Sequence, residues 1–115
     1  MADATLAHAF VRIARESPDA VAVVDRGEPT SYGELLYHAR CFAGLLREGG
    51  IGPGDVIGIE LPRSRDTLVV MLGAWFAGAA FLPVDIAWPA ARRRGIHETA
   101  RVRRVVTSEI GRAHV

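Results

Sequence analysis

The sequence contains no lysine, so all 14 of its Lys+Arg residues are arginine. A lysine Schiff base and a lysine phosphate clamp are therefore excluded within this chain. Its single cysteine, Cys41, excludes an internal disulfide and a metal site built from several cysteines. We expect Cys41 to be a partly buried helix residue. The formal net charge of +1 argues against a dedicated nucleic-acid binder.

A convincing membrane span is also missing. The uncharged stretch over residues 67–84 is flanked by Asp66 and Asp85 rather than by basic anchors, and Gly78 and Pro83 interrupt it. A break at Gly78 divides this stretch into a helix and a short strand that can both be buried. The N-terminus has no basic region before an apolar run, so it does not read as a secretory signal. We expect a cytoplasmic protein with no membrane partner.

What remains is a chain of 115 residues, 50% of them hydrophobic, which is enough for one small domain or a piece of a larger one. Periodicity and breaker residues predict nine elements along it. Helices are expected between Asp3 and Pro18, over 31–50, over 65–77 and from Pro89 onward, and strands over 20–25, 28–31, 56–61, 79–85 and 103–108. Helices that alternate with strands imply crossover connections and a largely parallel sheet, so the predicted class is α/β.

Local signals support several of these boundaries. Ser31 and Glu34 form an S-x-x-E capping box at the start of a helix. Ser64 can cap the next helix, and Gly78 can end it with a tight turn into the following strand. Asp85 follows that strand, near the rim where parallel sheets bind ligands. It is therefore a candidate ligand residue, although we favour a turn or cap aspartate.

Three stretches, in order and at matching spacing, resemble the adenylate-forming enzymes of the AMP-dependent synthetase and ligase superfamily. "PTSYGEL", residues 29–35, resembles the first core motif, and "FAGAAFLPVD", residues 76–85, resembles the second. The connector over residues 45–75 is also similar, with Gly-x-x-x-Gly-Asp, an apolar strand and Pro-Arg-Ser. The pattern is most similar to the amino-acid adenylation domain of non-ribosomal peptide synthetases. We assign residues 1–108 to an N-terminal fragment of this α/β fold, with an incomplete sheet.

The resemblance implies that the parent enzyme activates an amino acid or another carboxylic acid with ATP and Mg²⁺. It implies an acyl-adenylate, release of pyrophosphate and transfer of the acyl group to a thiol. In peptide synthetases this thiol is the phosphopantetheine arm of a carrier protein. The rest of the adenylation domain and this carrier protein are then the expected partners.

The sequence departs from the family pattern in two places. Phe76 stands where the second motif usually has lysine, Phe81 where it has tyrosine, and Ile86 where a proline follows the aspartate. The later stretch "RRRGIHETARVRR" should carry an apolar helix face, but Arg93, Gly95 and His97 lie on it. We expect His97 to be solvated or to face a partner rather than to act in catalysis or metal binding. We also expect a solvated face, not a nucleic-acid patch, for Arg92, Arg93, Arg94, Arg101, Arg103 and Arg104.

The sequence also lacks the family's phosphate loop, which is rich in Ser, Thr and Gly and ends near a lysine. The ATP-binding aspartate and the catalytic lysine belong to later segments of the family. We therefore assign no catalytic, cofactor-binding or metal residue, and we expect the fragment itself to be inactive. An acyl-CoA ligase fragment and a non-catalytic scaffold that retains part of the fold stay open as alternatives.

The last residues, "EIGRAHV", do not continue the family pattern. They can be encoded by a DNA string that matches the start of a common sequencing-library adapter. We therefore expect residues 109–115 to be a non-native tail that arose by adapter read-through, with a natural tail as the alternative.

Overall fold

The computed structural model describes the backbone of residues 2–108 and the side chains of residues 7–108, so the expected non-native tail over residues 109–115 lies outside the described residues. All nine predicted elements are present, and their ends lie within about two residues of the predicted ones. They are α1 (Ala2–Glu16), β1 (Val21–Asp25), β2 (Glu28–Ser31), α2 (Tyr32–Glu48), β3 (Val56–Glu60), α3 (Arg65–Phe76), β4 (Ala80–Pro83), α4 (Ala90–Ala100) and β5 (Arg104–Thr107).

Two separate sheets form. The larger has the order β4-β3-β5, and both of its pairs are parallel, as the alternation of helices and strands predicts. Pro83 is the last residue of the outer strand β4, where its missing N–H removes no hydrogen bond from the middle of the sheet. The smaller sheet is the antiparallel hairpin of β1 and β2. Its turn residues Arg26 and Gly27 have φ values of 55° and 81°, which is the pattern of a type I′ turn.

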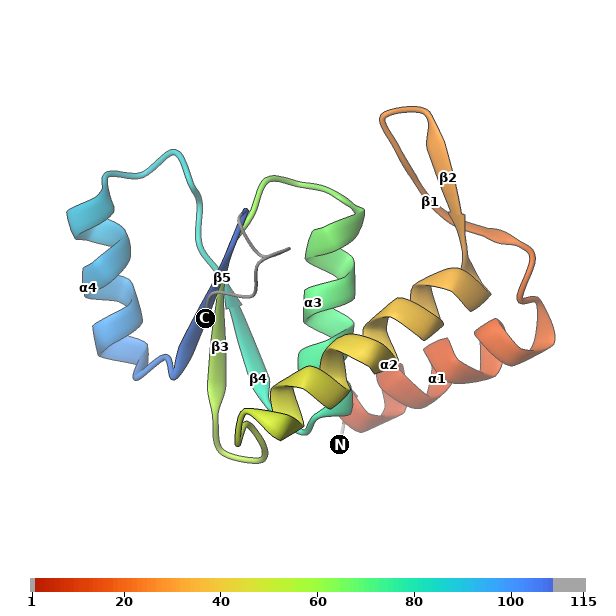
Figure 1. The fold of residues 1–115 in the computed structure, drawn as a ribbon, viewed down its shortest axis with the longest axis horizontal. Coiled ribbons are helices and arrows are strands. Elements are labelled where there is room, and N and C mark those ends of the chain that lie inside the picture. The colour runs from red at the N-terminus through yellow and green to blue at the C-terminus, as the bar shows by residue number, and fades with distance from the viewer. Residues whose placement is uncertain (1, 109–115) are drawn as a thin grey trace.

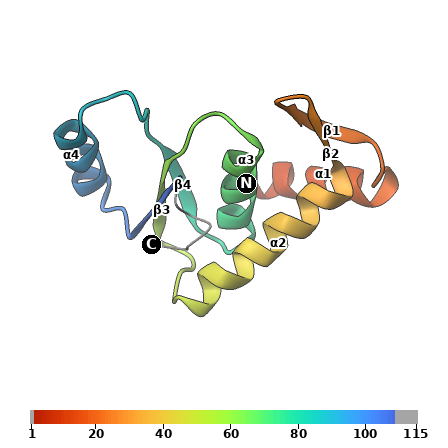
Figure 2. The ribbon, with the colours of Figure 1, turned by 45° about the horizontal axis from the view of Figure 1, so that its top comes forward.

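The larger sheet separates two layers of helices. Figures 1 and 2 show α3 on one side of the three strands and α4 on the other. Along β3, Ile57 and Ile59 point into the core with α2 and α3, where they are 0% and 1% exposed. Because side chains alternate along a strand, Gly58 and Glu60 point to the opposite face, toward α4. The polar residues of β3 and α4 are thereby brought together.

The helix pair α2 and α3 forms most of the core. The buried residues of α2 are Leu35, Ala39, Ala43 and Leu46, which is the apolar stripe expected of an amphipathic helix. Gly73 of α3 lets the two helices approach closely, because a Cβ at this position would lie 2.8 Å from Phe42 Cδ2 and 3.1 Å from the Ala39 carbonyl oxygen of α2. The N-terminus of each helix is capped as predicted: the Ser31–Glu34 box caps α2, and Ser64 caps α3.

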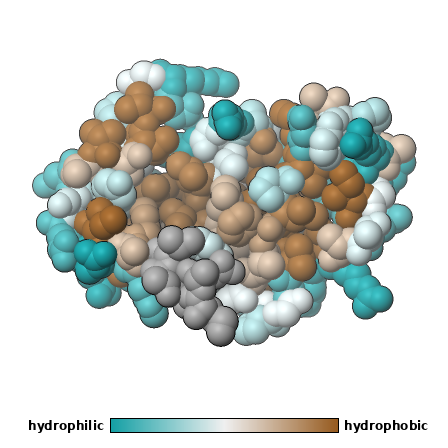
Figure 3. All heavy atoms as spheres, turned by 180° about the vertical axis from the view of Figure 1, so that it is seen from behind, coloured by the Kyte–Doolittle hydropathy of each residue, from teal (hydrophilic) through white to brown (hydrophobic). Residues whose placement is uncertain are grey.

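The expectation for Cys41 is wrong, because this side chain is exposed. Ala39 and Ala43 face the core, and a residue midway between them on a helix points to the other side. Larger apolar side chains are exposed as well, with Val24 at 62% and Leu45 at 59%. Figure 3 shows hydrophobic residues across the middle of the face opposite to that of Figure 1. Among the described helices, none is long and apolar enough to cross a membrane.

Candidate functional site at the carboxyl edge of the sheet

The carboxyl ends of β4, β3 and β5 meet at one edge of the sheet. Open parallel sheets bind their ligands at this edge, so it is the first place to look for a site. Glu60 ends β3, Pro83 ends β4 and Thr107 ends β5. Glu60 is the acidic residue among these three, and it is the centre of a polar network that links the sheet to α4.

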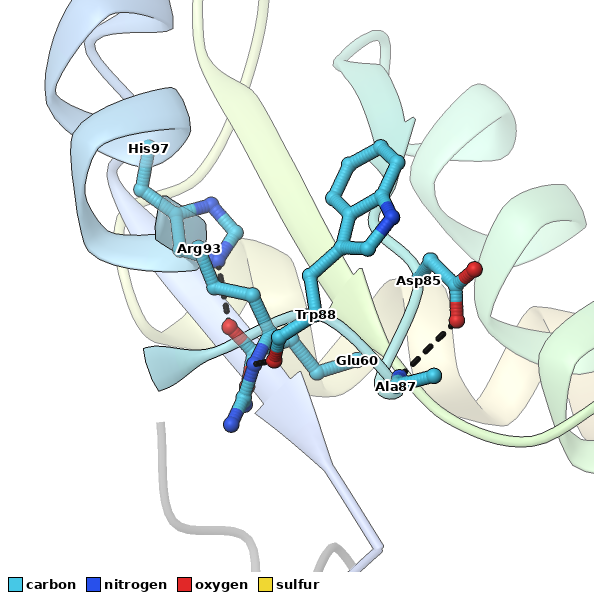
Figure 4. A network of polar contacts seen from close by, with 6 residues as sticks. All are labelled: Glu60, Asp85, Ala87, Trp88, Arg93 and His97. Carbon is cyan, nitrogen blue, oxygen red and sulfur yellow. Dashed lines mark hydrogen bonds and ion pairs between the residues drawn. The ribbon is translucent and has the colours of Figure 1, made fainter. Parts of the chain in front are cut away.

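Glu60 binds two basic side chains at once. Its Oε1 atom accepts a hydrogen bond from Arg93 Nη1 at 2.8 Å, and its Oε2 atom lies 2.7 Å from His97 Nε2. Arg93 also donates through Nε to the Trp88 carbonyl oxygen at 2.9 Å. Figure 4 shows these side chains converging from β3, from α4 and from the loop between β4 and α4. One carboxylate therefore ties the helix and the loop to the central strand.

Local structure explains why these residues meet. Arg93 and His97 are four residues apart on α4, so they lie on the same helix face. Gly58 provides the space for the imidazole, since a Cβ at this position would lie 2.7 Å from His97 Cε1 and 3.1 Å from Val102 Cγ1. The helix contributes no fully buried residue of its own. Its attachment to the sheet therefore depends strongly on the polar contacts.

The network is an attachment rather than a catalytic dyad. The side chains of Glu60 and His97 are 13% and 12% exposed. Since a carboxylate only accepts hydrogen bonds, Nε2 is the protonated nitrogen of His97. Its Nδ1 atom is buried and has no hydrogen-bond partner among the described residues. A general base must reach the proton that it removes, and here the free nitrogen is packed against Gly58.

These contacts correct two expectations. His97 is neither solvated nor free to face a partner, and Arg93 does not belong to a solvated face. Glu60, 37 residues before His97 in the sequence, supplies the charge that makes their burial possible. Arg104 is also engaged, because its Nη2 donates to the Gly49 carbonyl oxygen at 3.0 Å. Arg92 is exposed with its guanidinium 4.2 Å from the Trp88 ring centroid, and Arg94 and Arg101 are exposed as expected.

Arg103 belongs to a second cluster, at the opposite edge of the sheet. It donates through Nη1 to Asp55 Oδ2 at 3.0 Å and to the Gly50 carbonyl oxygen at 3.0 Å. Asp55 also accepts from the Gly52 N–H at 2.8 Å. The Gly52 N–H, and after it Arg103, lower the pKa of the Asp55 carboxyl. This cluster fastens the start of β5 to the loop before β3.

Asp85 lies at the carboxyl edge but has the role of a turn residue. Its Oδ1 atom accepts from the Ala87 N–H at 2.9 Å, and its carbonyl oxygen accepts from the Trp88 N–H at 3.1 Å. The turn interpretation is therefore confirmed. Figure 4 shows this carboxylate directed away from the Glu60 network.

The described residues do not fit ATP or Mg²⁺. At the carboxyl edge, the guanidinium of Arg93 is already paired with the Glu60 carboxylate. Within residues 2–108, no cluster of three His, Cys, Asp or Glu side chains could hold a metal ion. The chain also offers no lysine for a phosphate.

Sequence reasoning missed Glu60 as a site residue, although two signals were present. An acidic residue at the end of an apolar central strand needs a partner when it is buried. Arg93 and His97 are basic residues at helical spacing on the crossover that returns to the same sheet. Matching these two features would have predicted the contact.

Comparisons with known proteins agree with this fold. The sequence profile of the family described as AMP-binding enzyme matches residues 10–115. Pyochelin synthetase PchE of Pseudomonas aeruginosa is 42% identical over 105 residues, which are 91% of this chain and 7% of that protein. Tyrocidine synthase 2 of Brevibacillus parabrevis is 40% identical over 112 residues, or 97% of this chain and 3% of that protein. The chain thus spans less than a tenth of the length of these relatives.

Solved structures show the same relationship. The crystal structure of the non-ribosomal peptide synthetase FmoA3 (S1046A) superposes with a TM-score of 0.87 at 35% identity, over 96% of this chain and 12% of that one. The N-terminal subdomain of Klebsiella oxytoca NpsA, in complex with anthranilyl-AMSN, superposes with a TM-score of 0.83 at 25% identity. That match covers 88% of this chain and 27% of the subdomain. The chain is homologous to the N-terminal part of peptide-synthetase adenylation domains.

Proposed function

The chain belongs to the AMP-binding enzyme family, and we propose that it is the N-terminal scaffold of a unit that activates a carboxylic acid as its acyl-adenylate. The observation that carries this proposal is the superposition on FmoA3, which covers 96% of this chain and 12% of that protein. The two matched core motifs lie on structural elements. Residues 29–35 run from β2 through the capping box into α2, and residues 76–85 run from the end of α3 through β4 to Asp85.

The complete unit would join the carboxylate of an amino acid or a related acid to the α-phosphate of ATP and release pyrophosphate. The acyl group would then pass to the thiol of a carrier protein, with AMP as the leaving group. The described residues supply the first part of the sheet and its packed helices, and they supply no group to the nucleotide. By itself the chain is therefore inactive, and ATP and Mg²⁺ belong to the parent enzyme, which acts in the cytoplasm.

A peptide synthetase is favoured over an acyl-CoA ligase as the parent, because PchE, tyrocidine synthase 2 and FmoA3 are synthetases or synthetase components. A carrier protein is the matching thiol partner, in keeping with the adenylation–PCP fusion of NpsA and ThdA that has also been solved. A scaffold without catalysis remains the alternative outcome of the experiment below.

A segment exchange in PchE tests the proposal. Residues 10–108 would replace the matching segment of PchE, and amino-acid-dependent exchange of pyrophosphate into ATP would be measured. We expect the chimera to retain exchange with the amino acid that PchE itself uses, because the exchanged segment is scaffold. A matched chimera that carries Gly73→Asp should lose activity, because an aspartate does not fit between α2 and α3.

The isolated chain serves as the second arm, and it should show no exchange with any amino acid. Exchange by the isolated chain would overturn the assignment as an inactive scaffold. A chimera with native circular dichroism and no exchange would overturn the assignment as an adenylation segment and favour the non-catalytic alternative.

The family profile extends through residue 115, but because adapter-like codons can encode the last seven residues, we also propose that residues 109–115 are not part of the natural protein. Long-read sequencing of the source DNA across the codon of Ser108 tests this directly. A frame that continues into a Ser/Thr/Gly-rich loop with a lysine is the expected result. A genome that encodes the same seven residues would overturn it.

A further inference from the structure

A groove of about 490 Å³ lies between α1, α2 and α3, on the part of the molecule away from the carboxyl edge. Helices α1 and α2 run side by side, and both contact α3 (Figure 1). The volume is within the range of sites that hold ligands in proteins. None of the residues of the Glu60 network lines this groove.

One wall of the groove is aromatic and held in place. Trp75 and Phe76, at the end of α3, line it, and the Trp75 ring makes an edge contact with Phe81 at 5.8 Å between centroids. Val11 of α1 and Ala43 of α2 add apolar surface. A wall of this kind accepts one large apolar side chain, because aromatic surfaces that are already ordered lose little entropy when they bind.

The rim of the groove is basic. His8, Arg40 and Arg47 line it, and none of the described lining residues is acidic. Arg47 donates through Nη2 to the Phe76 carbonyl oxygen, so part of its hydrogen-bonding capacity serves the end of α3. Arg40 is different, since no ion pair engages it within the described part of the chain. The groove therefore presents an uncompensated guanidinium beside an apolar wall.

The spacing of the two arginines indicates the kind of occupant. Arg40 and Arg47 are seven residues apart on α2, which places their backbones about 10 Å apart along the helix axis. Two acidic residues about two helical turns apart on one peptide match this separation, so that each can pair with one guanidinium. We propose that this groove binds an acidic peptide segment that inserts one large apolar side chain against Trp75 and Phe76. The mode is that of a peptide that lies in a groove between helices.

Tryptophan fluorescence provides the test. The chain has two tryptophans, so the Trp88→Phe variant leaves Trp75 as the reporter inside the groove. The probe is a synthetic peptide with two glutamates two helical turns apart and one phenylalanine between them. The control peptide has lysines in place of the glutamates. We expect a saturable change of Trp75 emission with the acidic peptide and none with the basic one.

Charge variants test whether the acidic peptide binds in this groove. Arg40→Glu should weaken binding by at least about tenfold, because it replaces a charged hydrogen-bond donor with a repulsive group. Arg94→Glu makes the same change of net charge on exposed α4 and should leave binding unchanged. Both side chains are exposed, so both variants should keep the circular dichroism of the parent.

Three results would overturn the proposal. The first is the absence of a saturable emission change, and the second is an equal loss of affinity in the two charge variants. The third is an emission change that follows protein concentration without peptide, which would assign the groove to a second copy of the chain. The adenylation proposal is independent of all three, because it is tested by pyrophosphate exchange in the chimera.

Discussion

His97 Nε2 lies 2.7 Å from Glu60 Oε2, although 37 residues separate the two in the sequence. This contact explains how a family fold can keep its shape with basic residues on a helix face that should be apolar. The charge on α4 is matched by a carboxylate on β3, and the imidazole takes the space above Gly58. Three positions on two elements therefore depend on one another.

Replacement of Gly58 by alanine should destabilise the chain. The new Cβ would lie 2.7 Å from His97 Cε1 and 2.8 Å from Nδ1. The ring cannot rotate away without losing Glu60, so we expect a cost of about 1–3 kcal/mol in the free energy of unfolding. Urea denaturation followed by circular dichroism measures it.

Two controls accompany this variant. In a His97→Ala background, Gly58→Ala should cost much less, and an equal cost in both backgrounds would show that the imidazole is not the obstacle. Gly95→Ala on α4 meets no atom within 4 Å. It should stabilise the chain by about 0.5–1 kcal/mol, because alanine is the better helix former.

Removal of the Glu60 carboxylate alone should lower the free energy of unfolding more than replacement of Glu60, Arg93 and His97 together. Glu60→Ala leaves Arg93 and His97 partly buried without their partner, and we expect it to cost about 2–3 kcal/mol. The triple variant with leucine at all three positions should recover most of that loss, because packed apolar residues often replace a buried ion pair without cost. Thermal unfolding of the two variants and the parent compares them. A triple variant no more stable than Glu60→Ala would contradict this explanation.

The chain should lose stability in acid through Asp55 and Glu34. The Gly52 N–H and Arg103 lower the pKa of Asp55, and the Ser31 backbone and side chain lower the pKa of Glu34. A pKa that is lower in the folded state stabilises the fold above the unfolded value. That contribution is lost as the pH falls through the unfolded value of about 4 and then through the folded one.

Chemical denaturation as a function of pH measures this dependence. The variant with both Asp55→Asn and Glu34→Gln should be less stable at neutral pH and should lose less stability between neutral pH and acid. A parent and a variant with identical slopes below about pH 4 would show that other carboxyl groups control the acid response.

One substitution in the β1–β2 hairpin turn should stabilise the chain. Arg26 has a left-handed φ of 55°, which is unfavourable for a residue with a long side chain, and Gly27 follows with φ 81°. Asn-Gly is a preferred pair for a type I′ turn, so Arg26→Asn should raise the free energy of unfolding by about 0.5–1 kcal/mol. Arg26→Val, a β-branched residue that avoids this region, should lower it. Equal stability of the two variants would show that the turn does not limit the fold.

Most of the fold could be predicted because its signals are local. The Ser31–Glu34 box, the caps at Ser64 and Gly78, and the alternation of helices and strands each depend on residues within a few positions of one another. The turn role of Asp85 is local as well, since it binds an N–H two residues away. These predictions needed no knowledge of how the elements pack.

The Glu60 site was harder to predict from the sequence, because its contacts join residues that are far apart in the chain. Composition and periodicity made the arginines of α4 and its flanks look solvated, yet Arg93 and Arg104 bind acceptors 33 and 55 residues away. Arg103 is 46% exposed, as expected, but it also binds acceptors 48 and 53 residues away. Cys41 was misjudged for a different reason: its residue type suggested burial, although the apolar stripe of α2 already places it on the other side of the helix.

By itself, therefore, the sequence determined the α/β class, the order of the elements, their caps and the family. Those properties follow from backbone preferences and motif spacing. Only the tertiary structure decided that Glu60 would lie beneath α4, that Gly58 would make room for His97 and that Trp75, Phe76 and Arg40 would line one groove between three helices. The physical reason is that such contacts form only when elements that are distant in the sequence pack together. Local sequence patterns do not specify which side chains then come into contact.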